Sequence, residues 1–320
     1  MAKLVPLLVT WRAARMLRVS ALRRAATLAA GAGLAATAHC AISAHAEAAK
    51  ADIADEMSSA VATIRNSLDA ANPPGWKRLL RHFYPDEKRC IIGHLQETTY
   101  AGKLYPEAAR QRILDTLVYR KEHDSNRPWP KLASDIESAR CRDYWPFAFA
   151  ANAPDGSPVE ICRLKNLDIS RILSDFPEDE HAEVLHFFGL WCESCLRRLG
   201  ASFRAGAPTK GSIHVWDCRD VSWLALLSDA NSHWHTVSRV FLLGQSHWPN
   251  LSSSYYVIYA PYTVHYLWKL IKPLTTEQTQ QKVSFSKGVP DALVEALGSE
   301  DAVARMLERG ESLREPTKRA

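Results

Sequence analysis

The cysteine thiols and histidine imidazoles are the side chains of this chain most suited to catalysis or metal binding. Their spacing in the sequence defines no catalytic site. Cys192 and Cys195 form a Cys-x-x-Cys pair, which occurs in redox-active sites and as half of a zinc site. The pair lies within a helical pattern of apolar residues and has no second such pair elsewhere in the sequence. We therefore predict that both thiols belong to the core. Reduced cysteines indicate the cytosol or an organelle matrix.

Histidines are frequent in the second half of the chain, among them His233, His235, His247 and His265. No pair has the His-Glu-x-x-His arrangement of a zinc hydrolase. The sequence also lacks a Gly-x-Ser-x-Gly elbow, a P-loop and a Gly-x-Gly-x-x-Gly turn. Because it offers no nucleophile with a recognisable base, we predict that the protein is not an enzyme and holds no metal.

The most informative elements are a strand and the strongly apolar helix that follows it. Residues 255–259 are β-branched and aromatic, and Ala260 and Pro261 end the run, as expected for an interior strand. Residues 262–271 place apolar side chains over most of a helix's circumference, and Pro273 ends this helix. Such a helix needs apolar contact on more than one side, which either a protein core or a cavity beneath a lid supplies.

The order and spacing of motifs in this region resemble the CRAL-TRIO (Sec14-like) lipid-transfer family. That family has a Tyr-Pro-Glu turn, an aliphatic strand ending Asn-Ala-Pro, a gating helix ending Lys-Pro-Phe, and a short helix with a lysine. The corresponding segments here are residues 248–250, 255–261, 262–273 and 275–283, and they fit without a gap.

Two upstream segments resemble the same family. Residues 211–217 resemble its strand ending in Asp, with Asp220 where the family has Gly, and residues 150–164 resemble its Asp-x-x-Gly-x-Pro-Val hairpin. The resemblance implies an α/β fold, in which a small N-terminal helical subdomain precedes a CRAL-TRIO (Sec14-like) domain. That domain has a mainly parallel sheet as its floor, covering helices, and a gating helix over a hydrophobic cavity.

Five segments are predicted along the chain. They are a targeting or leader segment at 1–46, a helical arm at 52–71, the helical subdomain at 76–125, the lipid-binding domain at 129–290, and a C-terminal helix with a polar tail at 291–320.

The resemblance also implies the function. We expect the protein to bind a single hydrophobic ligand, a phospholipid or other lipid, and to transfer or present it at membranes through the gating helix. A non-exchanging lipid sensor or scaffold, or a haem-binding member of the fold, is the alternative. We expect no cofactor beyond the bound lipid, with haem as the alternative ligand, and the sequence indicates no particular protein partner.

The family's head-group residues map onto two elements here. In members that bind phosphatidylinositol, a Thr and a Lys of the short helix bind the head group, and the Thr contacts its phosphate. The Glu of the turn helps to position the Lys. Thr279 and Lys282 match these residues, while Asn250 replaces the Glu. Ser212 and His214 fall where choline-lipid binders place small hydroxyl side chains. A His there could hydrogen-bond a head group, meet a haem iron together with a nearby Tyr, or pack as a neutral side chain.

The helical subdomain and the gating helix supply the remaining candidates. Lys103 is the one cation in residues 100–104, where the family has an Arg-rich motif. Trp268, Tyr266 and Leu267 are expected to enter the bilayer interface when the gate opens. The full set of gate and membrane-facing residues is Tyr262, Val264, Tyr266, Leu267, Trp268, Ile271 and Lys272.

The charge distribution bears on which partners the protein can bind and on its location in the cell. The net charge is +5, but residues 1–46 hold six basic and no acidic residues, leaving 34 basic against 35 acidic residues. A broad nucleic-acid interface is therefore excluded. The Ala- and Arg-rich leader indicates a mitochondrial or plastid transit peptide, with a secretory signal or a membrane anchor as alternatives. We expect an intracellular protein, cytosolic or organellar, that associates peripherally with membranes.

Overall fold

The computed structural model describes residues 55–77, 79, 87–98, 103–125, 127–168, 171, 174 and 181–313. The predicted leader at 1–46 and residues 314–320 of the predicted tail lie outside these residues. The chain divides into two compact units, 1–60 and 61–320. Residues 55–71, within the predicted arm, are helical. The sheet and the cavity described below belong to the second unit.

A five-stranded sheet forms the centre of this unit, and its strands follow one another in sequence order. They are β1 (Phe147–Asn152), β2 (Pro158–Arg163), β3 (Ser212–Asp217), β4 (Ser252–Ile258) and β5 (Val283–Phe285). β1 and β2 are antiparallel, and the three later pairings are parallel. The mainly parallel sheet predicted from the sequence is confirmed.

The β1–β2 hairpin forms where the sequence supplies turn chemistry. Gly156 has a φ of +81°, and a Cβ there would lie 2.4 Å from the Cβ of Ala207. Glycine is therefore required both by the backbone conformation and by the close approach. The carboxylate of Asp155 accepts hydrogen bonds from the backbone N–H and the hydroxyl of Ser157, at 2.8 and 2.9 Å. The turn is thus fixed by its own side chains.

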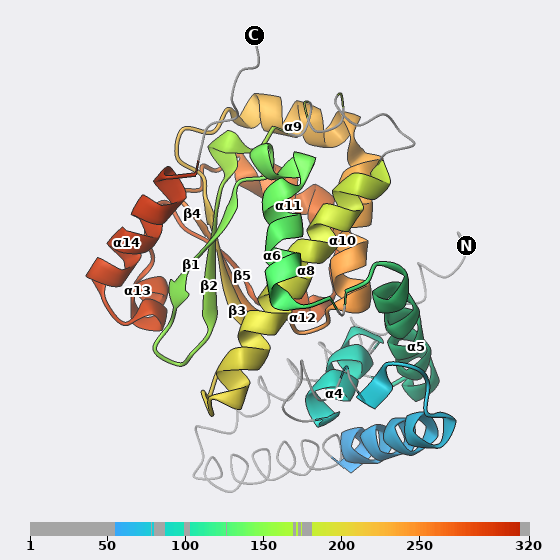
Figure 1. The fold of residues 1–320 in the computed structure, drawn as a ribbon. Helices are drawn as coiled ribbons and strands as arrows, with labels where there is room; N and C mark the ends of the chain where they lie inside the picture. Colours follow the sequence, from blue (N-terminus) through green and yellow to red (C-terminus); the bar gives the residue numbers. More distant parts are fainter. Residues whose placement is uncertain are drawn as a thin grey trace, which may run out of the picture. The chain divides into compact units, whose positions relative to one another are not determined.

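One face of the sheet packs on the C-terminal helices α13 (Asp291–Leu297) and α14 (Glu300–Glu311), as Figure 1 shows. This face carries alternate residues of the strands, because successive strand side chains point to opposite faces. They are Val159, Ile161, Ile213, Val215 and Ile258. The sequence predicted one C-terminal helix, whereas the structure has two. Gly298 ends α13 in the left-handed conformation, and the side chain of Ser299 caps α14.

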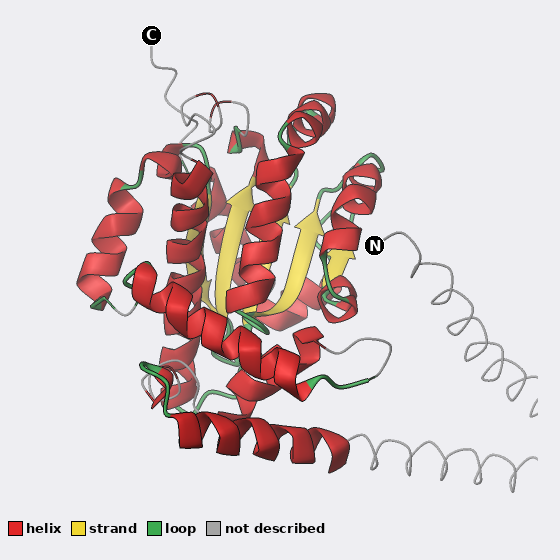
Figure 2. Ribbon diagram, turned by 90° about the vertical axis from the view of Figure 1, so that its right-hand side faces the viewer, coloured by secondary structure: helices red, strands yellow, loops and turns green. Residues whose placement is uncertain are grey.

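The opposite face is covered by helices that connect the strands, and Figure 2 shows the strands side by side between the helices. These helices are α8 (His181–Arg204), α9 (Trp223–Ser232), α10 (Trp234–His247), α11 (Val264–Ile271) and α12 (Glu277–Gln281). Among the described residues, none of the helices combines the length and the apolar character that a membrane crossing requires.

The helical subdomain is joined to this helical layer by a buried ion pair. The subdomain contains α4 (Glu87–Thr98) and α5 (Pro106–Glu122), and α6 (Trp129–Ser138) follows. Arg120 of α5 donates two hydrogen bonds, of 2.6 and 2.9 Å, to the carboxylate of Glu193 in α8, and both side chains are buried. Because removing either partner would strand a buried charge, this pair fixes α5 against α8.

Short 3-10 segments complete the connections between these elements. They are η1 (Arg140–Asp143), η2 (Leu164–Asn166) and η4 (Lys272–Leu274). η4 contains the Lys272–Pro273 pair and directly continues α11. The proline therefore ends the gating helix where the sequence predicted, while α11 itself begins at Val264 rather than at residue 262.

Candidate ligand-binding cavity

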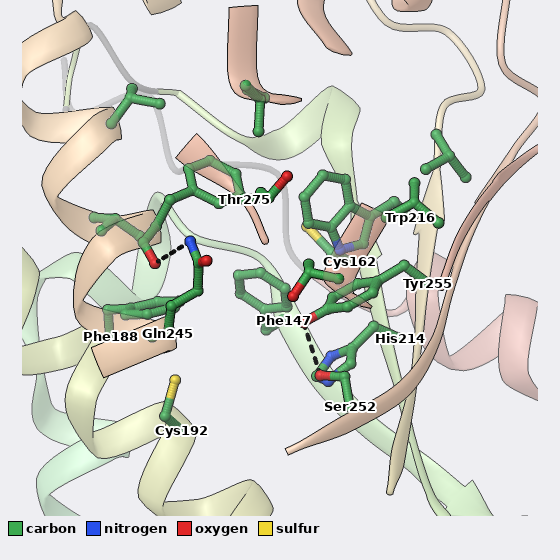
Figure 3. Close-up of a pocket in the computed structure, with 18 of the residues that line it drawn as sticks. Phe147, Cys162, Phe188, Cys192, His214, Trp216, Gln245, Ser252, Tyr255 and Thr275 are labelled. Carbon is green, nitrogen blue, oxygen red and sulfur yellow. Dashed lines mark hydrogen bonds between the residues drawn. The ribbon is translucent and has the colours of Figure 1, made fainter. Parts of the chain in front are cut away.

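A cavity of about 260 Å³ lies between the sheet and the helical layer of α8, α10 and α11. Figure 3 shows strand residues such as His214 and Tyr255 on one side and Phe188 and Gln245 from the helices on the other. Most of the lining is apolar. Its aromatic residues include Phe147, Phe188, Trp191, Trp216, Trp268 and Phe285. A molecule held here must therefore present mainly apolar surface.

Strand alternation determines which side chains form the floor. His214 of β3 pairs with Tyr255 of β4, which pairs with Val283 of β5, and all three line the cavity. Two residues further along, Trp216 and Val257 repeat the pattern. The floor is thus the face of the sheet opposite to the one that packs on α13 and α14.

The helix α11 closes the cavity with one of its two faces. The lining residues are Val264, Leu267, Trp268 and Ile271, which recur at helical spacing. Trp268 packs against Phe285 of the floor, with ring centroids 5.7 Å apart. Leu267 and Trp268 therefore point towards the cavity in this structure, and their entry into the bilayer interface on opening stays a prediction.

The other face of α11 carries apolar side chains in solvent. Tyr262, just before the helix, is 76% exposed, Tyr266 is 54% exposed and Leu270 is 43% exposed. They are spaced by four residues and so share one face. Lys272, also predicted at the gate, is exposed and does not line the cavity. The predicted gate residues thus divide into an inner set and an outer set.

Thr279 and Lys282 both line the cavity, at the end formed by α12 and β5. The ammonium group of Lys282 donates to the side-chain oxygen of Asn250 at 3.2 Å. Asn250 in turn donates to Gln96 of α4 at 2.6 Å. The side-chain amide of Asn250, which is hydrogen-bonded to the helical subdomain, therefore positions Lys282. The family that the sequence resembles has a carboxylate at this position.

Glu97 of α4 also lines this end, and sequence reasoning missed it. Burial raises the pKa of its carboxyl group, and Lys282 and Arg112 oppose that shift in part. Burial lowers the pKa of Lys282, and Glu97 opposes that shift. No local motif marks Glu97, because α4 precedes the sheet by some fifty residues of sequence. Its presence lowers the net positive charge at the lysine end.

A second polar group lies on the floor and is centred on Glu160 of β2. The carboxylate accepts hydrogen bonds from the indole N–H of Trp191 at 3.1 Å and the thiol of Cys195 at 2.6 Å. The Nδ1 atom of His214 lies 3.2 Å from it, and Tyr255 stacks on the His214 ring with centroids 5.0 Å apart. We call Glu160, His214, Tyr255 and Ser252 the inner polar cluster. A charged residue between the apolar residues Val159 and Ile161 was the available sequence signal for Glu160.

The Cys-x-x-Cys pair lies on α8, and both residues line the cavity. Cys192 and Cys195 are buried, which confirms the prediction that they are core thiols. Burial raises the pKa of both thiols well above the ordinary value, so they stay protonated. Within the part of the chain that is described, no three His, Cys, Asp or Glu side chains are grouped so as to hold a metal ion.

Two other predicted head-group residues do not reach the cavity. Ser212 is fully buried at the start of β3, and it is not among the lining residues. Lys103 is exposed, with its ammonium group 5.6 Å from the ring centre of Tyr105. Of the five residues predicted to serve a head group, the structure thus brings Thr279, Lys282 and His214 to one cavity.

Part of the chain matches the sequence model of a known protein family. A family model described as "CRAL/TRIO domain" matches residues 145–301. A solved structure titled "Crystal structure of Sfh5" is similar with a TM-score of 0.47 and 15% sequence identity, covering 83% of this chain and 92% of that chain. No curated protein matches the chain. The segment that matches the family model contains all five strands and the helices α8 to α12.

Proposed function

Because this chain is a CRAL/TRIO domain protein, with the domain at residues 145–301, we propose that it carries one phospholipid or other lipid in its cavity and transfers or presents it at membranes. CRAL/TRIO domains bind lipids and other small hydrophobic molecules in general. The observation that carries the proposal is the largely apolar cavity beneath α11, whose inner face lines it. We further propose that the protein acts as a carrier and not as an enzyme.

The physical advantage of such a cavity follows from the cost of exposing hydrocarbon to water. Each CH₂ group transferred from a membrane to water costs about 0.8 kcal/mol. Aromatic and aliphatic walls remove most of that cost during aqueous transit. The volume of about 260 Å³ is just below the range of about 300–1,000 Å³ typical of pockets for drug-sized ligands. A two-chain lipid therefore requires the cavity to widen.

We propose that α11 is the element that moves. It is short, it lies between Pro261 and Pro273, and its outer face offers tyrosines of the kind that favour the membrane interface. Contact with a bilayer would bury Tyr262 and Tyr266 and would stabilise a displaced α11. Opening would then expose the cavity to the acyl chains.

A matched pair of tryptophan substitutions on α11 tests this proposal. Leu267→Trp adds volume inside the cavity, and Leu270→Trp places the same side chain on the outer face of the same helix. We expect the first variant to lower the amount of lipid extracted from vesicles by the full chain at least about fivefold, because the ring fills the space for the ligand. The second should extract lipid as the parent does.

Melting temperatures of both variants are measured alongside, so that unfolding is separated from a blocked cavity. Equal extraction by a folded Leu267→Trp variant would contradict binding in this cavity.

Haem is the second candidate ligand, because the Nε2 atom of His214 is unpartnered within the described structure and the residue lines the cavity. An imidazole nitrogen of this kind is a suitable axial ligand for iron. The visible absorption spectrum of the purified full chain distinguishes the two: a haem band that His214→Ala removes would favour haem, and a colourless protein with bound lipid would favour the carrier.

A further inference from the structure

We propose that the inner polar cluster receives a hydroxyl group of the ligand, so that the preferred cargo is an apolar molecule with an alcohol group. This inference rests on the proposed carrier function and adds to it a ligand class. It concerns side chains of β2, β3 and β4, whereas Thr279 and Lys282 of the lysine end lie on α12 and directly before β5.

The protonation of the cluster follows from its hydrogen bonds. Glu160 is 1% exposed, and three neighbouring groups surround its carboxylate. Trp191 can only donate, and the protonated thiol of Cys195 also donates. A carboxylate accepts from a third donor most favourably, so the tautomer of His214 that fits this geometry carries its proton on Nδ1, 3.2 Å from Glu160. The Nε2 atom is then a hydrogen-bond acceptor.

That acceptor is unsatisfied in the protein itself. His214 is 8% exposed and lines the cavity, and within the described residues its Nε2 has no hydrogen-bond partner. Leaving a buried acceptor unpaired is unfavourable, because its lost hydration is not replaced by a hydrogen bond. A ligand hydroxyl that donates to this nitrogen removes the penalty, whereas a hydrocarbon leaves it in place.

Tyr255 supplies the complementary group. The hydroxyl of Ser252 donates to the phenolic oxygen of Tyr255 at 2.7 Å, which leaves the phenolic hydrogen available to a ligand. Burial raises the pKa of Tyr255, so the hydroxyl remains protonated. Because Tyr255 stacks on His214, one ligand hydroxyl can donate to the imidazole and accept from the phenol. Figure 3 shows His214, Ser252 and Tyr255 together on the strand side of the cavity.

The surrounding charge selects against an anionic group at the cluster. Glu160 belongs to the cluster, and a ligand carboxylate or phosphate beside its carboxylate would be repelled. Arg198 of α8 interacts electrostatically with Glu160 and offsets part of its charge, but Arg198 does not line the cavity. The cation of the cavity, Lys282, precedes β5, two strands from β3. Glu160 lies on β2, one strand further away, and three strand spacings amount to about 14 Å, so Lys282 does not neutralise Glu160 directly. A neutral hydroxyl therefore suits the cluster best.

Three matched probes measure this preference in the full chain. 1-Hexadecanol, hexadecyl methyl ether and hexadecane each compete against the neutral fluorescent probe N-phenyl-1-naphthylamine. The ether can accept but cannot donate a hydrogen bond. We expect the alcohol to displace the probe at a concentration about tenfold lower than the ether, because only the alcohol satisfies Nε2.

The variant His214→Phe keeps an aromatic ring beside Tyr255 but has no acceptor. It should bind the alcohol and the ether within about twofold of each other. His235→Phe, at an exposed position of α10, is the matched control and should retain the tenfold preference.

The outcomes separate this inference from the carrier function. Equal displacement by alcohol and ether in the unmodified protein, or a preference for the ether, would overturn the inference while leaving the carrier function in place. Failure of all three probes to displace the naphthylamine would overturn both. The comparison in the unmodified chain is decisive even if His214→Phe does not fold.

Discussion

Lys282 is the residue whose chemistry bears most directly on the lipid head group. Its ammonium group lies at the cavity, 3.2 Å from the oxygen of Asn250, with Glu97 nearby in the same lining. The amide orients the lysine without neutralising it, while Glu97 offsets part of its charge. We infer that this end can bind a phosphate, and that it does so less strongly than a site with an unopposed cation.

Lys282→Ala should weaken binding of phosphatidylinositol relative to phosphatidylcholine. A hydrogen bond to a charged group contributes about 1.5–3 kcal/mol, so we expect at least about a tenfold loss of the preference. Competition between the two lipids in vesicles measures it, and Lys287→Ala, an exposed lysine outside the lining, is the control. An unchanged preference would remove Lys282 from head-group binding.

Site residues that belong to a local sequence motif were predicted, whereas contacts between residues far apart in the sequence were missed. Thr279 and Lys282 sit in a local motif, and the structure places both at the cavity. Glu160 and His214 are adjacent because β2 pairs with β3, although they are more than fifty residues apart. The sequence alone did not give this register. Asp220 shows a local effect instead, since its φ of +58° matches the conformation that glycine adopts and that Asp tolerates.

At the scale of elements, the sequence predicted that α11 is apolar on most of its surface. It did not predict which face of the helix meets the sheet. Its inner residues face the floor, and its outer residues face solvent. Periodicity places both stripes on the helix but does not show which stripe meets the sheet, because both are apolar. The packing of Trp268 on Phe285 decides the orientation. The exposed stripe is therefore the surface that we assign to the membrane.

The double substitution Tyr262→Ser and Tyr266→Ser should reduce binding of the protein to lipid vesicles by about tenfold. Each ring removed deletes apolar area that the interface would otherwise bury. Its melting temperature should stay near that of the parent, since both rings are exposed. Vesicle sedimentation gives the affinity, with Tyr105→Ser, another exposed tyrosine, as the control. Full retention of vesicle binding would contradict the membrane role of α11.

At the scale of the whole second unit, ring stacking joins the helical subdomain to α10. Tyr119 of α5 stacks on His247 of α10 with ring centroids 4.4 Å apart. Burial is the main cause that lowers the pKa of His247 to about 4 and that of His94 in α4 to about 3. The sequence predicted the helical subdomain but not that His94 would be buried and His247 partly buried. The predicted leader stays a prediction, because residues 1–46 lie outside the described structure.

These two histidines predict that the protein loses stability in mild acid. Their folded pKa values lie below the ordinary value of 6.5, so the unfolded chain binds more protons. The stability they contribute is fully present above pH 6.5 and falls as the pH drops towards 4. Each histidine contributes a slope of about 1.4 kcal/mol per pH unit within that window.

Urea unfolding at pH 7, 6 and 5 measures this slope, and the variant His247→Gln should make it shallower. The raised pKa of Glu97 acts in the opposite direction. A free energy of unfolding that stays constant from pH 7 to 5 would contradict the lowered pKa values of the two histidines.

The central claim is that the cavity holds a hydrophobic ligand, and native mass spectrometry of the purified full chain tests it most directly. We predict one additional mass per chain, which is lost on denaturation and which extraction identifies as a lipid. Incubation of ligand-free protein with lipid vesicles should restore it. A chain that shows only its own mass, before and after such incubation, would contradict the account.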